Sequence, residues 1–456
     1  MFALTLWLPQ VFNDGDTWWH VAAGRLMIAR GEVLATDPFS FTMAGRPWMT
    51  HEWLSEVLFG GAFNLGGWGG VQLLTALAAG AAAGLLARCT ARWTTGLPQV
   101  SLLVVALSLC MPHLLARPHV LAWPLLVAWT AELLVARDED RAPRWRFLPL
   151  MVLWANLHGS SLFGPVLVAP FALEAVLAAP APRRASVALR WGGFGLAAAL
   201  AALATPHGIG GIVYELRLTL MSSLGRIGEW QAADFASVQP VEIALLGVVL
   251  FMLLRPLRLP VIRALVLLVL AHVALRYNRH EQLLGLVGAL LLAKPLGEVT
   301  FPATPRLTLR PSVVLASAVG VAVLLGGARL ATPVVWRDSL TRPVQALASV
   351  PADLRAQPVL NDFQYGGYLI GHGVRPYIDS RSDMYGDGFL QAYARLADGD
   401  RAALTKLLAG GRIRWAILVA GSPMERAMRL QPGWRRTHAD AWAVVYARDP
   451  GAAAGI

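Results

Sequence analysis

The sequence has little charge, almost no lysine and only two cysteines. Charged residues make up 15% of the 456 residues, whereas a soluble globular domain carries about a quarter. Lys294 and Lys406 are the only lysines, so the net charge of +11 comes almost wholly from arginine. Cys89 and Cys110 lie in or beside apolar runs and make neither a disulfide framework nor a metal knuckle. These shortages exclude a disulfide-rich secreted domain and argue against a soluble globular protein.

Long apolar runs dominate the sequence instead. Hydrophobic residues make up 56% of the chain, and runs of about 17–25 residues, the length that a bilayer core requires, recur through its first three quarters. The sequence therefore predicts a mainly α-helical, polytopic membrane protein embedded in the lipid bilayer. We predict about eleven spans, near residues 1–12, 67–87, 97–115, 119–136, 147–156, 161–179, 191–204, 241–254, 261–275, 282–296 and 312–331.

The first of these segments is too short to cross a bilayer. A helix of residues 1–12 extends about 18 Å, against about 30 Å of hydrocarbon. We expect that the true start of the chain lies upstream; the alternative is a first helix that crosses poorly. We expect no cleavable signal peptide, because the apolar start has neither a basic n-region nor a small-residue cleavage site.

The loops between the spans form two alternating sets. The first set carries the basic residues Arg88 and Arg92, then Arg137, Arg141, Arg144 and Arg146, then Arg183, Arg184 and Arg190, then Arg255, Arg258 and Arg263, then Lys294, Arg306 and Arg310. These loops hold no histidine, and the positive-inside rule makes them cytoplasmic. In a soluble protein this net charge would indicate a nucleic acid partner; here the arginines flank apolar runs, so we expect no nucleic acid partner.

The second set of loops holds the chemically reactive residues. It comprises "NDGDTWWH", "DPFSFT", "THEWLSE", "ARPHV", "ANLHGSS", "TPHG", "GEWQAADF" and "RYNRHE". Tryptophan and histidine are ordinary at span ends, but all ten histidines lie on or near this side. We therefore expect a protein that works at the outer face of the membrane. Loops 88–96, 137–146 and 180–190 would be cytoplasmic, and residues 13–66 and 334–456 periplasmic.

The C-terminal tail is more polar and contains no spanning run, so we divide the chain into a transmembrane domain, 1–333, and a soluble external domain, 334–456. Alternating predicted strands and helices indicate a small α/β domain. We predict strands at "QPVLND", "RPYIDS", "RWAILVA" and "AWAVVYAR", and helices at "GDGFLQAYARLADG" and "DRAALTKLLAGG". The polar stretches "NDFQYGGYLIGHG" and "IDSRSDMYGDG" could bind ligands, but we expect turns, the commoner reason for Asp-Gly.

The first external loop, residues 13–66, is predicted to contain two helices in the membrane interface. After "NDGDTWWH" the chain continues as "HVAAGRLMIARGE", a helix that Trp18 and Trp19 would anchor. A second helix starts at "HEWLSEVLF". Helical periodicity places on its polar face His51, Glu52, Ser55 and Glu56, and on its lipid-facing side Trp53, Leu54, Val57 and Leu58.

This arrangement resembles the GT-C class of lipid-dependent glycosyltransferases, which includes the protein O-mannosyltransferases and the aminoarabinose transferases of lipid A. In that class an acidic motif follows the first span, and a surface helix, a glycine and a His-Pro-Pro-Leu turn precede the second span. "DGDTWWHVAAG" matches the first part and "HEWL" the second, with Glu52 and Trp53 in place of the two prolines. The chain is also similar to uncharacterised bacterial membrane proteins of this type in "DPFSFT", "GRPW", "HEWL", "WANLHGS" and "PYIDSRSDMYG".

The resemblance implies transfer of a sugar from a polyprenyl-phosphate donor to a lipid, glycan or protein acceptor. Phosphate is a good leaving group, so the remaining task is to deprotonate the acceptor hydroxyl, and a carboxylate can act as the general base. The candidates are Asp16, slightly favoured because it adjoins the aromatic pair, and Asp14. An Asp-x-Asp pair can instead hold a divalent cation, Mg²⁺ or Mn²⁺. The class contains metal-dependent and metal-independent members, so no cofactor is assigned, and Asp16 can also cap its helix.

The leaving phosphate requires cations. Arg117, Arg276 and Arg279 lie at the outer ends of spans, against the positive-inside bias, so we expect each to have a partner there. Arginine binds phosphate bidentately, whereas snorkelling to lipid head groups is the alternative. We also assign three residues to substrate binding, His51, Glu52 and His158. Three further histidines can contact the sugar, the phosphate or a metal: His119, His207 and His280.

Two functions of another class stay open. The same polar face could admit a lipid-linked sugar to a transporter or flippase. Alternatively, the chain could be a non-catalytic scaffold in envelope polysaccharide assembly, with its tail as a docking domain. No acidic residue near the middle of a span and no pair of broken helices stands out, which counts against a coupled transporter.

Overall fold

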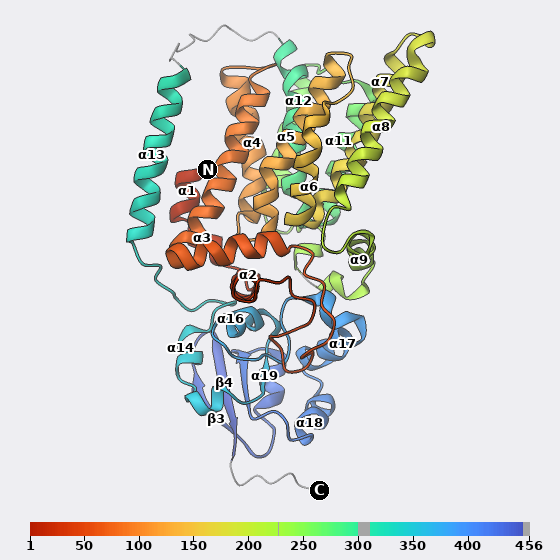
Figure 1. The fold of residues 1–456 in the computed structure, drawn as a ribbon. Helices are drawn as coiled ribbons and strands as arrows, with labels where there is room; N and C mark the ends of the chain where they lie inside the picture. The colour runs from red at the N-terminus through yellow and green to blue at the C-terminus, as the bar shows by residue number, and fades with distance from the viewer. Residues whose placement is uncertain (227, 300–310, 450–456) are drawn as a thin grey trace.

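The computed structural model describes residues 1–226, 228–299 and 311–449, which form a helical bundle with a small α/β unit at one end (Figure 1). The bundle contains α1 (Phe2–Trp7), α3 (Trp53–Thr90), α4 (Leu97–Cys110), α5 (Pro118–Asp138), α6 (Leu148–Leu157), α7 (Phe163–Ala178), α8 (Arg184–Ala202), α10 (Pro240–Leu254), α11 (Val261–Arg276), α12 (Glu281–Glu298) and α13 (Pro311–Ala331). Every segment predicted as a span overlaps one of these helices, although α1 covers only half of the first segment, 1–12.

The bundle helices differ in length and in burial. Within the described chain, four helical segments are long and apolar enough to cross a membrane, judged by length and composition: Trp53–Thr90, Pro118–Asp138, Gly159–Ala178 and Ala181–Ala202. That the other helices also cross stays a prediction. The core lies along α5 and α12, where residues such as Val127, Trp129 and Leu291 are fully buried.

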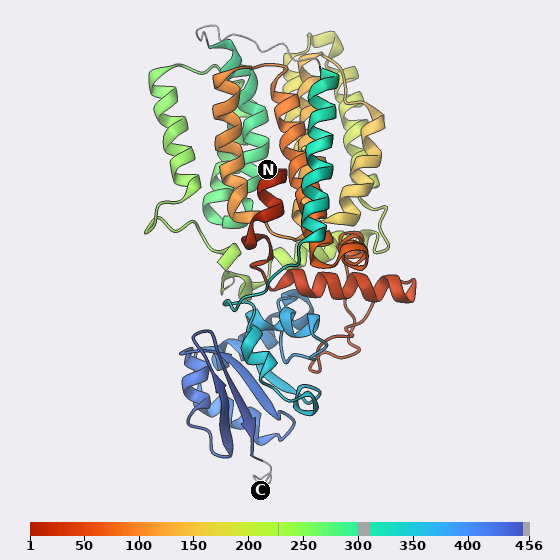
Figure 2. The same ribbon diagram turned by 90° about the vertical axis from the view of Figure 1, so that its left-hand side faces the viewer.

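Two helical segments of residues 13–66, the loop predicted to be external, lie across the end of the bundle, next to the α/β unit (Figures 1 and 2). They are α2 (Asp16–Arg30) and the first part of α3, which bends into the bundle at Gly66–Gly67. The backbones of α2 and α3 touch where they cross, because a Cβ on Gly24 would lie 1.7 Å from the carbonyl oxygen of Glu56. Helices therefore exist at both predicted positions, and their location in a membrane interface stays a prediction.

The tryptophans of α2 do not anchor in lipid, contrary to the sequence-based expectation. Trp18 and Trp19 are both buried in protein. Trp18 packs against Trp68 and Trp336, with ring centroids 4.2 and 4.8 Å away. The reason is that the α/β unit covers α2 on the side away from the bundle (Figure 1).

The predicted faces of the second helix are also partly wrong. The indole of Trp53 donates a hydrogen bond to Oδ1 of Asn156, 2.8 Å away, and Leu54 packs against the bundle core. Neither side chain is therefore free to face lipid. Asp16 does not cap its own helix, which the sequence leaves open as an alternative role. It is the first residue of α2, and Gly15 occupies the N-cap position.

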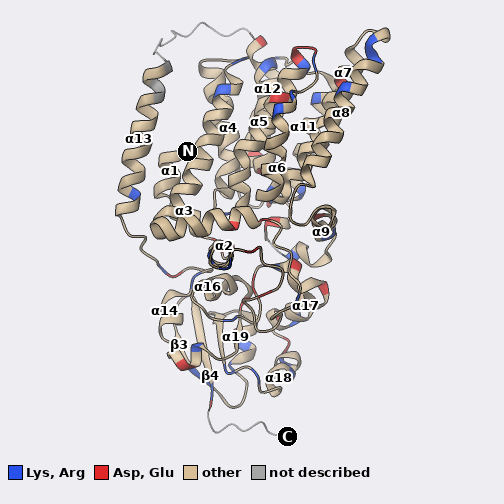
Figure 3. Cartoon of the chain, viewed as in Figure 1, with Lys and Arg blue, Asp and Glu red and all other residues tan. Residues whose placement is uncertain are grey.

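The arginine-rich loops lie at the end of the bundle opposite the α/β unit (Figure 3). The alternation of the two loop sets is thus built into the fold, while the side of the membrane on which each end lies stays a prediction. Arg306 and Arg310 fall outside the described residues. One helix near the α/β unit, α9 (Ile209–Thr219), is not among the predicted elements.

The C-terminal unit surrounds a four-stranded sheet of order β1-β2-β4-β3, in which β1 and β2 are parallel and β4 is antiparallel to both neighbours. Its elements are α14 (Val344–Ala348), α15 (Ala352–Arg355), β1 (Val359–Asn361), α16 (Gly366–Gly371), α17 (Ser382–Ala397), α18 (Arg401–Ala409), β2 (Trp415–Val419), α19 (Pro423–Met428), β3 (Trp434–Ala439) and β4 (Ala443–Arg448). The small α/β sheet predicted from the tail is confirmed.

Two local predictions in this unit need correction. The stretch "RPYIDS" is not a strand, because the side chain of Asn361 binds its backbone instead, accepting from the N–H of Tyr377 and donating to the carbonyl of Ile378. The prediction of turns in "NDFQYGGYLIGHG" is right at Gly373, which has a φ of 74°, a conformation that suits glycine. It is wrong at Gly366, where α16 begins.

Candidate active site

A partly buried arginine joins the two aspartates of the segment 13–66. Arg117 immediately precedes α5. Its Nε lies 3.2 Å from Oδ2 of Asp14, and its Nη2 lies 2.5 Å from Oδ2 of Asp16. The two segments meet because the hydroxyl of Thr17 donates a hydrogen bond to the carbonyl oxygen of Ala116, 3.1 Å away. The fold thus brings one predicted phosphate-binding cation to both predicted catalytic carboxylates.

The ion pairs continue from Arg117 to a second predicted cation. Nη1 of Arg117 lies 2.7 Å from Oε2 of Glu229, and Oε1 of Glu229 lies 3.4 Å from Nη1 of Arg279. The guanidinium of Arg279 also stacks over the ring of Trp230 at 4.3 Å. Burial alone would raise the pKa of Glu229, but Arg117 and Arg279 lower it to about 2. This carboxylate therefore stays charged and bridges the two arginines.

The two aspartates differ in how closely they pair with Arg117. Asp16 lies 3.3 Å from the indole N–H of Trp19 in addition to its contact with Arg117. Oδ1 of Asp14 accepts the backbone N–H of Asp16, and its Oδ2 lies 3.2 Å from Nε of Arg117, a longer contact than the 2.5 Å between Arg117 and Asp16. Burial raises the pKa of Asp14 to about 7, and Arg117 opposes this rise. Burial raises the pKa of Asp16 too, again against Arg117.

A cavity of about 320 Å³ lies beside this cluster. Its apolar wall is formed by Trp123, Leu126, Trp154, Phe163, Val166 and Leu283, which come from α5, α6, α7 and α12. Its polar wall includes Arg279, His119, His158 and Glu215. Ligand sites usually combine a mostly apolar lining with a few polar groups in this way. Arg279 therefore belongs both to the cavity wall and to the chain of ion pairs that ends at the aspartates.

A second polar cluster borders the same cavity. Oε1 of Glu52 lies 3.3 Å from Nε2 of His158, and Nε2 of His51 lies 3.4 Å from Oε1 of Glu215 on α9. Burial raises the pKa of Glu52 to about 7. Burial alone would lower the pKa of His51, but Glu215 and Glu52 raise it to about 9. The three residues assigned to substrate binding, His51, Glu52 and His158, are thus neighbours in space.

The remaining sequence-predicted residues fall in different places. His119 and His280 line the large cavity, and His207 lines a smaller one next to His51. Arg276 is exposed at the end of α11, where its guanidinium lies over the ring of the adjacent Tyr277. The chain turns after α11, so the structure brings Arg279, and not Arg276, to the cavity.

Some residues of this site do not follow from the sequence. Glu229 lies in the stretch "GEWQAADF", where an acidic residue beside a tryptophan is a signal that could have singled it out. Glu215 lies on the unpredicted α9, and its carboxylate packs so closely on Gly159 that a Cβ there would lie 2.3 Å from Oε1. No local pattern marks it.

The aspartate pair fits a guanidinium better than a metal ion. Both Oδ2 atoms pair with Arg117, as does Glu229, so a divalent cation would have to displace that side chain. Among the described residues, no group of three or more histidine, cysteine, aspartate or glutamate side chains is arranged to hold a metal. The Mg²⁺ or Mn²⁺ site left open at Asp14 and Asp16 therefore does not match this geometry.

Comparison with solved structures identifies the fold. ArnT from Cupriavidus metallidurans, bound to undecaprenyl phosphate, is similar at a TM-score of 0.52 and 12% identity, over 98% of this chain and 97% of that chain. ArnT in the apo state (0.49, 13% identity, 98% and 96%) and the apo oligosaccharyltransferase of Archaeoglobus fulgidus (0.48, 11% identity, 99% and 74%) are also similar. No protein-family model and no curated protein matches the chain. The likeness to ArnT confirms the GT-C fold that the sequence motifs indicate.

Proposed function

We propose that this chain, which has the GT-C fold, is a membrane glycosyltransferase that moves a sugar from a polyprenyl-phosphate donor to an acceptor hydroxyl at the outer face. One observation carries the proposal: an apolar cavity whose polar wall contains Arg279 is connected through Glu229 and Arg117 to the Asp14–Asp16 pair. The arrangement offers, in spatial order, a surface for an isoprenoid chain, cations for a phosphate and a carboxylate for a proton.

The chemistry of the cavity supports this donor class. Aromatic and aliphatic walls suit an isoprenoid chain, and arginine binds phosphate oxygens through paired hydrogen bonds. Glu229 pairs with Nη1 of Arg279, and a guanidinium has five N–H donors, so phosphate oxygens can bind to it at the same time. The ArnT structure of the same fold holds undecaprenyl phosphate, which is a ligand of this class.

Asp14 meets the requirements of a general base better than Asp16, although the sequence alone slightly favours Asp16. Its Oδ2 lies 3.2 Å from Arg117, farther than Oδ2 of Asp16 at 2.5 Å, and its pKa of about 7 suits proton transfer near neutral pH. The acceptor oxygen would attack the anomeric carbon while its proton passes to Asp14. The bond to the phosphate oxygen would break with its electron pair, and Arg279 would neutralise the released phosphate. Asp16 would hold Arg117 in place.

A transfer assay with the purified chain in detergent tests this function. A panel of radiolabelled polyprenyl-phosphate sugars would be incubated with membrane extract as the acceptor source, and nucleotide sugars would serve as the matched control donors. We expect label on the acceptor and free polyprenyl phosphate from at least one lipid donor, and nothing from the nucleotide sugars. Movement of an intact lipid donor across liposomes without transfer would contradict the proposal and favour a flippase.

The outer-face location depends on the topology, which single-cysteine labelling tests. Cysteines would be placed one at a time at Arg141, in a loop at the arginine-rich end, and at Asp400, in the C-terminal unit, of a chain without Cys89 and Cys110. A membrane-impermeant maleimide added to intact cells should label position 400 and leave position 141 unlabelled, because the arginine loops should be cytoplasmic. Labelling of 141 but not of 400 would reverse the topology.

A further inference from the structure

The C-terminal unit touches the segment that carries the two aspartates. A Cβ on Gly367, in α16, would lie 1.9 Å from the carbonyl oxygen of Gly15, which stands between Asp14 and Asp16. Real Cβ atoms do not approach an oxygen this closely, so a glycine is required here. α16 therefore packs backbone to backbone against the aspartate segment, and a shift of this helix would move the carboxylates.

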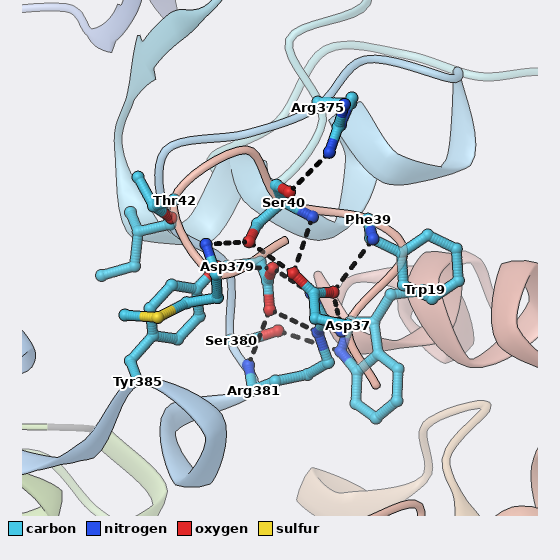
Figure 4. Close-up of polar contacts among 12 residues, drawn as sticks. Trp19, Asp37, Phe39, Ser40, Thr42, Arg375, Asp379, Ser380, Arg381 and Tyr385 are labelled. Carbon is cyan, nitrogen blue, oxygen red and sulfur yellow. Dashed lines mark hydrogen bonds and ion pairs between the residues drawn. The ribbon is translucent and has the colours of Figure 1, made fainter. Parts of the chain in front are cut away.

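A side chain of the same unit also reaches the hydrogen bonds of Asp16. The indole N–H of Trp19 lies 3.1 Å from Oγ of Ser380 and 3.3 Å from Oδ1 of Asp16. One donor, the indole N–H of Trp19, is thus shared between Ser380 of the C-terminal unit (Figure 4) and the carboxylate of Asp16 in α2. Because the indole is held between the two acceptors, the position of Ser380 affects how Trp19 contacts Asp16.

A buried arginine clamps Ser380 to the first external loop (Figure 4). Nε and Nη2 of Arg381 lie 2.8 and 2.7 Å from the two carboxylate oxygens of Asp379, and Nη1 lies 2.9 Å from Oδ1 of Asp37. All three side chains are fully buried, and Tyr385 donates a further hydrogen bond to Asp379. Buried charges persist only when they are paired and hydrogen-bonded in this way. The clamp therefore joins the C-terminal unit to the loop between α2 and α3 in one geometry.

We propose that the C-terminal unit is a fixed part of the reaction centre, in which α16 and the Asp37–Arg381–Asp379 clamp hold the Asp14–Asp16 segment in its working position. The inference rests on the proposed transfer function and deepens it. Gly367, Ser380 and Arg381 are positioning residues, since they act through the aspartate segment. The unit would then be needed for the chemical step itself, which distinguishes this role from that of a docking domain.

Gly367→Ala in the full chain tests the proposal, because the added Cβ must push the aspartate segment away. A displacement of about 1 Å can lower kcat about 10²-fold. Binding of undecaprenyl phosphate, the sugar-free probe, should stay unchanged, because the cavity is lined by other elements. Hydrogen–deuterium exchange of the amides of residues 13–20 should become faster. Gly388→Ala is the matched control, since a Cβ on this glycine of α17 meets nothing within 4 Å; it should change none of the three measurements.

Ser380→Ala is a gentler variant that decides the question if Gly367→Ala fails to fold. It should lower kcat roughly tenfold, as expected for one lost hydrogen bond near a charged group, again with unchanged probe binding. Ser380→Thr, which keeps the hydroxyl, should retain most of the activity. Ser349→Ala, elsewhere in the same unit, is the control.

Three outcomes would overturn the proposal. The first is a rate of hydrogen–deuterium exchange at residues 13–20 of Gly367→Ala that equals the wild-type rate. The second is a wild-type kcat in both Gly367→Ala and Ser380→Ala. The third is a loss of undecaprenyl phosphate binding as large as the loss of kcat. If the wild-type chain transfers no sugar, the proposed function fails separately, and the exchange measurement still decides whether the C-terminal unit holds the aspartate segment.

Discussion

Two arginines at opposite ends of the bundle hold carboxylates in different ways. Arg263 of α11 donates two hydrogen bonds of 3.0 Å to Glu174 and one of 3.1 Å to Asp138, and its side chain is 5% exposed. Arg117, near the C-terminal unit, has a side chain that is 19% exposed. It pairs with Asp14, Asp16 and Glu229, and Glu229 links it to Arg279 in the cavity wall. One arrangement is closed, and the other is open to a ligand.

The difference separates an ion-pair cluster that stabilises from one that can react. We call the first the anchor cluster (Arg263, Glu174, Asp138, Arg137 and Lys294) and the second the site cluster (Asp14, Asp16, Arg117, Glu229 and Arg279). In the anchor cluster two further cations are present. Arg137 lies 3.2 Å from Glu174, and Lys294 lies 3.4 Å from Asp138, so both carboxylates have several partners. A carboxylate that has a perturbed pKa, such as Asp14, and is linked to a cavity wall is typical of a functional site instead.

The largest effect should follow removal of the base from the site cluster. Asp14→Asn keeps the oxygen that accepts the N–H of Asp16 but cannot take a proton. We expect kcat to fall about 10²–10⁴-fold, with donor binding and thermal stability nearly unchanged, as measured by transfer and by thermal unfolding in detergent.

Asp16→Asn is the matched variant for this prediction. It should cost less activity, because Asp16 is assigned to holding Arg117. A larger loss in Asp16→Asn than in Asp14→Asn would return the role of base to Asp16, which sequence reasoning slightly favours.

The anchor cluster should show the opposite phenotype. Glu174→Gln removes the carboxylate that binds Arg263 bidentately, and breaking a buried ion pair costs about 3–5 kcal/mol of unfolding free energy. The thermal midpoint in detergent should therefore drop, while kcat per folded molecule should stay at the wild-type value. Loss of kcat without loss of stability would show that this end of the bundle also takes part in transfer.

A smaller effect should separate the two arginines predicted to bind phosphate. Arg279→Ala should weaken binding of undecaprenyl phosphate by about 10–100-fold, as expected for loss of hydrogen bonds to a charged group. Arg276→Ala removes an exposed side chain that contacts Tyr277, so it serves as the control and should bind normally. Equal weakening in both variants would contradict the placement of the phosphate at Arg279.

The pH dependence should be the mildest signature. Asp14 acts as a base only when it is deprotonated, and its pKa is raised to about 7. The kcat should therefore rise as the pH increases through about 7 and level off above it, with a loss of about tenfold one unit below the pKa. Glu174→Gln should show the same profile. A kcat that does not vary between about pH 5.5 and 8.5 would rule out Asp14 as the titrating base.

The positions of the helices could be predicted from the sequence because hydrophobic length is a local signal. All eleven apolar segments overlap helices, and the acidic motif and the arginines at span ends led to Asp14, Asp16, Arg117 and Arg279. α9 escaped because it is short and begins at Ile209 after a glycine, with too little apolar length to stand out.

The partners of these residues could not be predicted, because they are set by contacts between distant segments. Glu229 bridges Arg117 and Arg279 only after three loops meet. "GGY" looks like a turn in the sequence, yet Gly367 is a packing position against a residue more than 300 positions earlier. Trp18 and Trp19 look like interfacial anchors until the C-terminal unit covers them. Such contacts leave no periodic trace in the chain.

The most direct test of the account is a single-turnover measurement with the Asp14→Asn/Asp16→Asn chain preloaded with a transferable polyprenyl-phosphate sugar. The release of polyprenyl phosphate and the appearance of labelled acceptor would be followed together against the wild type. We predict that the double variant binds the donor and releases neither product, because the cavity and Arg279 are intact while the base is gone. Full transfer by the double variant would contradict the catalytic role of the site cluster and favour transport or scaffolding instead.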